Sequence, residues 1–313
     1  MKRCAGILGV GAYVPETVCT NHDIVARGVE TSHDWIVART GIHERRLATA
    51  HETTTVMSIN AAQAALETAG ISARDLDMIV VATTTPDYRG FPSVASQVQV
   101  GLGAGHCPAW DLSAACSGFV YGLDVVTRLI ESGAYQHVLL IAADRLSHRV
   151  DWSDRSTCIL FGDGAGAVVM GRVNAGGVVA TSLHADGSHG SILSLPNDPP
   201  YIDMDGQSVF KVAVNCVVPS VMEALDLAGL TVADIDWFVP HQANQRIMDH
   251  AVKKLGLPAN RMVCNIDRYG NTSAASIPIG LAESQSKFKS GDVIVIIGFG
   301  AGFTWGTGVI IWE

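Results

Sequence analysis

The chain of 313 residues repeats itself once, and this repeat limits the folds that it can adopt. Residues 65–70 and 75–80 recur as residues 224–229 and 234–239, in both cases 159 residues further on and without a gap. A second set recurs at nearly the same offset: Gly122-Leu123 and Ser132-Gly133 return 158 residues further on as Gly280-Leu281 and Ser290-Gly291, and the strand Val138–Ile141 returns as Val293–Ile296, 155 residues further on. Two copies at so long a period are typical of paired α/β units and not of a solenoid. The sequence therefore predicts two halves related by a pseudo-twofold axis.

Each copy predicts the same order of elements, which is helix, glycine, strand, loop, helix and strand. Apolar residues make up 48% of the chain and charged residues 16%. This balance suits helices packed over well-buried sheets. We therefore expect an α/β fold.

Cys116 stands where a run of small residues leads into a predicted amphipathic helix. Phe119, Leu123, Val126 and Ile130 follow it at helical spacing and form one apolar stripe. A cysteine in the first turn of a helix faces unpaired backbone N–H groups and the positive end of the helix dipole. Both favour the thiolate, so we expect the pKa of this thiol to lie below its ordinary value of about 8.5. The alternative is a free cysteine that packs as a small hydrophobe.

Two further polar residues follow at matching places in the second half. His241 comes directly after an apolar strand predicted over 235–239, and Asn271 lies in a Gly/Ser/Thr-rich loop before another helix. Cysteine supplies a nucleophile, histidine a group that can transfer a proton or donate a hydrogen bond, and asparagine a fixed amide donor. Taken singly, His241 is also consistent with a packing or capping residue, and Asn271 with a turn residue.

The repeat gives these three residues a shared position. It places Cys116 close to the loop 271–276, and it makes the strand that ends near Ala82 the counterpart of the strand before His241. All three side chains then lie at strand ends or helix starts around one pseudo-axis. Such crevices are where open α/β sheets bind ligands.

Several other classes of protein do not fit the sequence. The seven cysteines show no disulfide or zinc spacing, which indicates a reducing cytosol. The basic start followed by apolar residues 4–14 resembles a signal peptide, but its glycines and Pro15 favour a strand and a turn. No apolar run approaches the length of a membrane span. A net charge of −9 argues against nucleic-acid binding.

The glycine-rich loops do not indicate a nucleotide site. Residues 162–167 fit G-x-G-x-x-A, yet the chain continues as a predicted strand where a helix is required. Residues 298–302 miss the pattern and also lead into a strand-like run, 307–312. We expect these glycines to allow close backbone approach around the crevice.

From end to end the chain resembles the β-ketoacyl-acyl-carrier-protein synthase III family, condensing enzymes of the thiolase superfamily. The resemblance is carried by several motifs: Asp34–Ile42, Asp111–Leu123, Phe161–Gly166, His184–Gly187, Val209–Val212, His241–Asn244, Gly270–Ser276 and Phe299–Gly306. It implies a thiolase-like fold with a layered α/β/α/β/α architecture. It also implies two halves, 1–172 carrying the nucleophilic cysteine and 173–313 carrying the histidine and the asparagine.

The resemblance implies a decarboxylative Claisen condensation of an acyl-CoA primer with malonyl-acyl-carrier protein. Cys116 would carry the acyl group as a thioester, and the backbone amides of Cys116 and Ala301 would form the oxyanion hole. The family often has glycine at the position of Ala301. His241 and Asn271 would bind the thioester oxygen of the malonyl group while carbon dioxide leaves. No cofactor and no metal is implied, since the CoA thioester is a substrate.

The resemblance also implies sites for the two substrates. Trp35 and Arg39 lie four residues apart, on one face of a predicted helix, where they can hold adenine. A surface cation–π pair is the alternative. The implied CoA site contains Trp35, Arg39, Arg155, Gly206, Phe210 and Asn244. A basic helix face beside the crevice is expected to attract an acidic carrier protein through Arg246, Lys253, Lys254 and Lys211, although a charged face is usually only solvated.

The family's remaining properties are expectations of the same kind. Phe91 matches a position that closes the acyl pocket of the neighbouring subunit in a homodimer, where a bulky ring favours acetyl or other short primers. We expect a cytoplasmic enzyme that starts fatty acid synthesis. The alternatives are an acyltransferase or condensing enzyme of secondary metabolism on the same scaffold, and a non-catalytic dimer partner, against which the presence of Cys116 argues.

Overall fold

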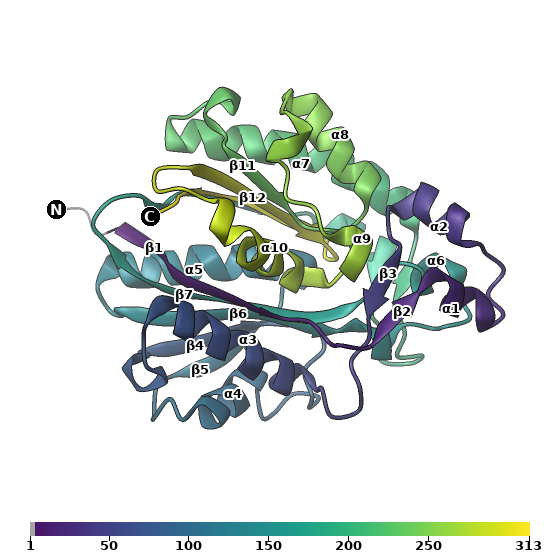
Figure 1. Cartoon of the computed structure of the whole chain (residues 1–313), viewed down its shortest axis with the longest axis horizontal. Helices are drawn as coiled ribbons and strands as arrows, with labels where there is room; N and C mark the ends of the chain where they lie inside the picture. Colours follow the sequence, from purple (N-terminus) through teal and green to yellow (C-terminus); the bar gives the residue numbers. More distant parts are fainter. Residues whose placement is uncertain (1–3) are drawn as a thin grey trace.

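The computed structural model describes residues 4–313 and contains two main sheets (Figure 1). The basic start of the signal-like segment, residues 1–3, lies outside the described residues. The first sheet has the order β1-β7-β6-β4-β5 and the second β11-β12-β13-β8. Their strands are β1 (Cys4–Tyr13), β4 (Met78–Ala82), β5 (Ala109–Leu112), β6 (His137–Arg145), β7 (Asp163–Val173), β8 (Gly177–Ala185), β11 (Trp237–Pro240), β12 (Val293–Gly300) and β13 (Thr304–Ile311).

The predicted repeat is confirmed in the topology of the two sheets. Read as β8-β13-β12-β11, the second sheet follows the same path as β1-β7-β6-β4 in the first. In each sheet the first two pairings are antiparallel and the third is parallel. The first sheet adds one more parallel strand, β5, at its edge.

The longer helices form three layers around the two sheets (Figure 1). α3 and α4 cover the outer face of the first sheet, α7 and α8 lie outside the second, and α5 and α10 are packed between the sheets. The helices are α1 (Asn21–Ala26), α2 (His33–Thr40), α3 (Thr54–Ala69), α4 (Val94–Leu102), α5 (Gly118–Ser132), α6 (Arg155–Cys158), α7 (Gly206–Ala228), α8 (Gln245–Leu255), α9 (Ile266–Tyr269) and α10 (Ser276–Ser284). The expected α/β/α/β/α architecture is thus confirmed.

Local sequence explains why the equivalent elements end where they do. α3 and α7 both end at a glycine, Gly70 and Gly229, with φ of 65° and 68°. This left-handed conformation closes a helix, and glycine adopts it without a steric cost. The predicted apolar stripe of α5 is confirmed, because Phe119, Leu123 and Ile130 are fully buried between the sheets.

Shorter elements form a cap at one end of the sheets (Figure 1). α1 and α2 pack together beside the small sheet of β2 (Val18–Thr20) and β3 (Glu44–Arg46), and α2 also contacts α8. A second small sheet pairs β9 (Leu193–Ser194) with β10 (Asp203–Met204), and α6 contacts β10. This cap carries several residues expected to bind CoA.

One helix among residues 4–313, α7, is long and apolar enough to cross a membrane by length and composition alone. It packs along β8, β12 and β13 and against α8. Within this fold it is therefore a helix that covers the second sheet.

Candidate active site

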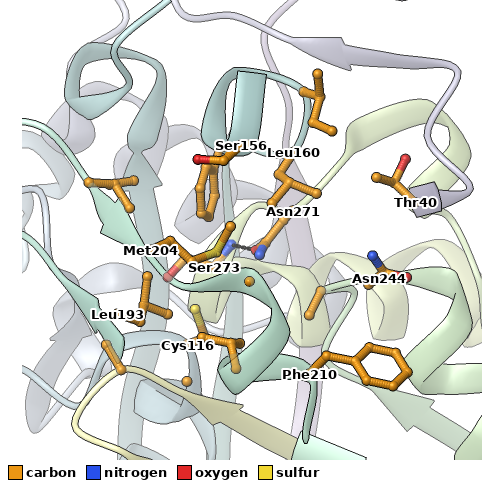
Figure 2. Close-up of a pocket in the computed structure, with 18 of the residues that line it drawn as sticks. Thr40, Cys116, Ser156, Leu160, Leu193, Met204, Phe210, Asn244, Asn271 and Ser273 are labelled. Carbon is orange, nitrogen blue, oxygen red and sulfur yellow. Dashed lines mark hydrogen bonds between the residues drawn. The ribbon is translucent and has the colours of Figure 1, made fainter. Parts of the chain in front are cut away.

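Cys116, His241 and Asn271 line one cavity of about 920 Å³. Cys116 comes from the short 3₁₀ turn η2 (Ala115–Ser117), His241 follows β11, and Asn271 precedes the equivalent turn η7 (Ser273–Ala275). Figure 2 shows Cys116 and Asn271 in this cavity. The shared position predicted from the repeat is therefore present in the structure.

The two turns are equivalent in conformation as well as in sequence position. Ala115 and Ser273, which lie 158 residues apart, have φ of 47° and 55°. They are the two non-glycine residues with positive φ in the described chain. Strained backbone of this kind is concentrated at functional sites, where the surrounding structure holds it in place.

Cys116 lies deeper than the sequence indicated. It sits in η2, two residues before α5 begins, and only 8% of its surface is exposed. The pKa of its thiol is raised to about 12, above all by burial; hydrogen bonding with Ser273 opposes this shift, and the negative Asp144 adds to it. The expectation of a thiol pKa below its ordinary value is wrong, because loss of solvation outweighs the helix start.

His241 is a buried, neutral imidazole. It is 1% exposed, and burial lowers the pKa of its ring to about 3 although a backbone hydrogen bond with Ser273 opposes this shift. Its Nδ1 lies 2.7 Å from the Ser276 hydroxyl, which also accepts the Gln242 amide at 3.2 Å. Phe299 packs edge-on against the ring, with 5.3 Å between centroids. The ring is thus fixed in place and uncharged at neutral pH.

Asn271 is oriented as a hydrogen-bond donor. Its Oδ1 accepts the backbone N–H of Ser273 at 2.8 Å (Figure 2). The backbone of Asn271 is tied to the neighbouring strand end by its own N–H to the Leu160 carbonyl at 2.8 Å and by the Gly162 N–H to its carbonyl at 3.0 Å. Because Oδ1 is occupied, the Nδ2 protons are the part of this side chain available to a substrate.

The segment of Ala301 is held against the Cys116 turn by hydroxyl groups. Thr304 Oγ1 lies 2.7 Å from Ser117 Oγ and donates to the carbonyls of Ala114 and Ala301, at 3.1 and 3.0 Å. Gly300 allows the contact, since a Cβ there would lie 2.8 Å from the Cys116 Cβ. Ala301 also lines the cavity.

The cavity opens between the cap and α8, where most of the expected CoA residues lie. The indole of Trp35 has the Arg39 and Arg155 guanidinium groups 5.5 and 4.9 Å from its ring centroid. Asn244 caps α8 by accepting the Arg246 amide, and it donates to the Arg39 carbonyl at 3.1 Å. The expected residues that line the cavity are Trp35, Arg39, Arg155, Gly206, Phe210, Asn244 and Arg246.

The other expected residues lie away from this cavity. Lys253 and Lys254 are exposed in the last turn of α8, whose predicted apolar face is buried, and Lys211 is exposed on α7. Phe91 is 88% exposed. None of these four side chains lines the cavity within this chain.

Sequence reasoning missed four residues that support the site: Asp144, Ser273, Ser276 and Thr304. Ser273 and Ser276 belong to the loop that the repeat had marked, so their position carried a signal. Asp144 is the last residue but one of a buried strand in the parallel part of the sheet, so its position also carried a signal. Nothing in the sequence links Thr304 to the Cys116 turn.

The paired halves and the five layers define an enzyme of the thiolase fold. Two family models match the chain: the 3-oxoacyl-[acyl-carrier-protein] synthase III model at residues 110–187 and its C-terminal model at residues 225–312. A curated relative from Bacillus cereus, β-ketoacyl-[acyl-carrier-protein] synthase III 1, is 50% identical and covers 98% of each chain. The crystal structure of 3-oxoacyl-[acyl-carrier-protein] synthase III from Aquifex aeolicus matches with a TM-score of 0.95 at 46% identity, over 98% of this chain and 100% of that one.

The chain therefore belongs to the β-ketoacyl-acyl-carrier-protein synthase III family. It is an acyltransferase that forms a carbon–carbon bond in the initiating condensation of fatty acid synthesis. A priming β-ketosynthase from the R1128 polyketide pathway has the same fold, with a TM-score of 0.95 at 36% identity over 100% of this chain and 97% of that one. Identity of about one half to curated synthases favours fatty acid synthesis over the secondary-metabolism alternative.

Proposed function

We propose that Cys116 takes the acyl group from acyl-CoA, and that His241 and Asn271 promote decarboxylation of malonyl-acyl-carrier protein at the same place. The observation that carries this proposal is the meeting of the three side chains in one cavity, with two uncharged donors beside a sulfur nucleophile. The product is a 3-oxoacyl-acyl-carrier protein.

In the first half-reaction the Cys116 sulfur attacks the thioester carbonyl of acyl-CoA. The backbone amides of Cys116 and Ala301 stabilise the negative oxygen of the tetrahedral intermediate. The hydroxyl links through Thr304 support this role because they hold the Ala301 turn against the Cys116 turn. CoA leaves and the acyl group stays on the sulfur.

In the second half-reaction the malonyl thioester loses carbon dioxide and forms an enolate. His241 and Asn271 donate hydrogen bonds to its oxygen. Since the His241 ring stays neutral well below pH 7, it stabilises the enolate without giving up its proton. A fixed donor of this kind typically lowers a barrier by about 3 kcal/mol. The enolate carbon then attacks the Cys116 thioester, and the thiolate leaves.

The substrates reach this centre from the cavity mouth. CoA would pass between the cap and α8, with its adenine at Trp35 and its phosphates near Arg39 and Arg155. The carrier protein would dock on the exposed basic residues of α8, Arg246, Lys253 and Lys254, extended by Lys211. A local basic face on a chain of net charge −9 favours an acidic partner in one orientation.

The enzyme would act as a homodimer. β5 is the last strand of the first sheet, and its outer edge pairs with no strand among residues 4–313. Unpaired edges are normally covered, and a second copy would cover this one. The exposed Phe91 would then enter the partner's acyl pocket and favour acetyl or other short primers.

The seven free cysteines, none of them paired, support a cytoplasmic location. The proposed reaction uses no cofactor.

The proposal is tested by following the acyl group. The protein is incubated with a series of acyl-CoAs, the adduct is located by peptide mass mapping, and malonyl-acyl-carrier protein is then added. We expect an adduct on Cys116 with short primers and release of carbon dioxide on the second addition. Cys264→Ala removes an exposed thiol and should leave both results unchanged. An adduct elsewhere would refute the role of Cys116, and an adduct that survives malonyl-acyl-carrier protein would refute the condensation.

A further inference from the structure

Thr304 joins the nucleophile turn η2 to the turn between β12 and β13. Its hydroxyl oxygen lies 2.7 Å from that of Ser117, which is 187 residues away in the chain. Thr304 also donates to the Ala114 carbonyl at 3.1 Å and to the Ala301 carbonyl at 3.0 Å. Among residues 4–313, no backbone hydrogen bond joins these two segments. The hydrogen bonds between them therefore all pass through the Thr304 hydroxyl.

The two carbonyls that Thr304 contacts belong to the backbone on which the proposed oxyanion hole is built. The Ala114 oxygen accepts the Ser117 amide at 3.2 Å and the Ser117 hydroxyl at 2.7 Å as well as Thr304. Because a peptide group is planar, fixing its oxygen fixes the whole unit. The Ala114 peptide directly precedes the one that carries the Cys116 amide, and the Ala301 carbonyl directly follows the Ala301 amide. The hydroxyl thus fixes backbone beside both donors.

The two segments are in direct backbone contact. A Cβ at Gly300 would lie 2.8 Å from the Cys116 Cβ and 3.1 Å from the Cys116 nitrogen. Both β12 and β13 contact η2. A movement of the turn after Gly300 would therefore move the Ala301 amide relative to the Cys116 sulfur. A shift of about 1 Å in such a group can slow a reaction about 100-fold.

The repeat gives Thr304 a counterpart in the first half. Thr304 pairs with Gly300, the last residue of β12, as Asp163 pairs with Arg145, the last residue of β6. The turn η7 contacts β6 and β7, just as η2 contacts β12 and β13. Each turn of the site is thus held by the equivalent strand pair of the other half. Asp163 accepts backbone N–H groups, whereas Thr304 donates to carbonyls beside the proposed oxyanion hole.

We infer that Thr304 is the positioning residue of the oxyanion hole, and that its hydroxyl keeps the amides of Cys116 and Ala301 aimed at one oxygen. Thr304 itself does not line the cavity. The hole serves acylation and also the attack of the enolate on the Cys116 thioester, since each step forms a tetrahedral oxyanion there. Loss of carbon dioxide places its negative oxygen at His241 and Asn271 instead. This inference rests on the proposed function and adds the residue that sets the geometry of the hole.

The acylation step gives the first test. CoA release after rapid mixing with acetyl-CoA is measured by chemical quench. Thr304→Val removes the hydroxyl but keeps the shape, and it should acylate at least about 10-fold more slowly, less than the roughly 100-fold cost of deleting a donor outright. Thr304→Ser keeps the hydroxyl and should acylate near the unmodified rate. Thr304→Ala also lacks the hydroxyl and carries the same prediction as valine if valine disturbs folding.

A matched control lies on the same strand. Thr307 is fully buried, its hydroxyl lies 2.7 Å from that of Ser220, and neither residue lines the cavity. Thr307→Val therefore breaks the same kind of hydroxyl pair away from the site. It should acylate at the rate of the unmodified chain.

The second half-reaction separates positioning from a general structural role. Each variant is acetylated to completion and mixed with malonyl-acyl-carrier protein, and carbon dioxide and 3-oxoacyl product are counted. Thr304→Val should release carbon dioxide at the unmodified rate but form fewer product molecules than carbon dioxide. An enolate that does not attack the thioester takes a proton from water and leaves acetyl-acyl-carrier protein.

Three results would overturn the inference: acylation of Thr304→Val at the full rate, equal slowing in Thr304→Ser or Thr307→Val, or a carbon dioxide release that falls together with acylation. If the unmodified chain acquires no acetyl group on Cys116, the proposed function fails, and the role of Thr304 fails with it.

Discussion

Cys116, His241 and Asn271 are all buried and all uncharged at neutral pH, and this combination suits the chemistry of an enolate. A charged histidine would give its proton to the enolate, whereas a neutral donor only stabilises the negative oxygen. The same burial that keeps His241 neutral raises the pKa of Cys116. Burial therefore keeps His241 a neutral donor and at the same time disfavours the thiolate form of Cys116.

The first prediction concerns the ionisation of Cys116. Alkylation by iodoacetamide reports the thiolate, and with a thiol pKa of about 12 its rate should rise about tenfold per pH unit between pH 7 and pH 10 without a plateau. The measurement is the pH profile of carboxamidomethylation at Cys116 by mass spectrometry. A plateau below pH 8.5 would show that the helix start dominates over burial.

At the residue scale, the sequence predicted where the three side chains lie better than it predicted the pKa of Cys116. The repeat was enough to bring Cys116, His241 and Asn271 to one place, because equivalent segments occupy equivalent strand ends. The direction of the Cys116 pKa shift was wrong, since it depends on burial by β12 and on the charge of Asp144, and neither neighbour is close in sequence. The bonds from Ser276 and Thr304 were unpredictable for the same reason.

At the scale of elements, the end of β12 is packed directly against the nucleophile turn. A Cβ at Gly300 would lie 2.8 Å from the Cβ and 3.1 Å from the sulfur of Cys116. We predict that Gly300→Ala folds but acylates at least about 100-fold more slowly, because a small displacement of catalytic groups is costly. The control is Gly187→Ala, where a Cβ meets nothing within 4 Å. CoA release measures both, and near-normal acylation by Gly300→Ala would contradict the packing argument.

The outer face of α8 leads to a prediction about the carrier protein. Reversing the charges of Lys253 and Lys254 to glutamate should raise the KM for malonyl-acyl-carrier protein about tenfold by repelling an acidic partner. Acylation by acyl-CoA should not change. Lys289→Glu, beside the opposite end of β12, is the control and should change neither value. Steady-state kinetics at low and high salt measure the effect, and a KM that does not respond would remove α8 from the docking surface.

At the scale of the whole molecule, the first sheet has one strand more than the second, and that strand forms an open edge. We predict that sedimentation gives the mass of two chains. Phe91→Ala should leave this mass unchanged but raise the preference for hexanoyl-CoA over acetyl-CoA about tenfold, a typical value for a few methylenes. Leu227→Ala removes another exposed apolar side chain, on α7, and serves as the control. A monomer, or an unchanged preference, would contradict the proposed place of Phe91.

Cys116 from the first half and His241 and Asn271 from the second line one cavity, and the proposed reaction depends on their acting on the same substrate. The most direct test is a single turnover with the acetylated enzyme and malonyl-acyl-carrier protein, in which carbon dioxide and the 3-oxoacyl product are counted. We predict one of each per acetyl group on Cys116, and a strong loss of carbon dioxide release in His241→Ala. Loss of the acetyl group without carbon dioxide, or full release from His241→Ala, would contradict the account.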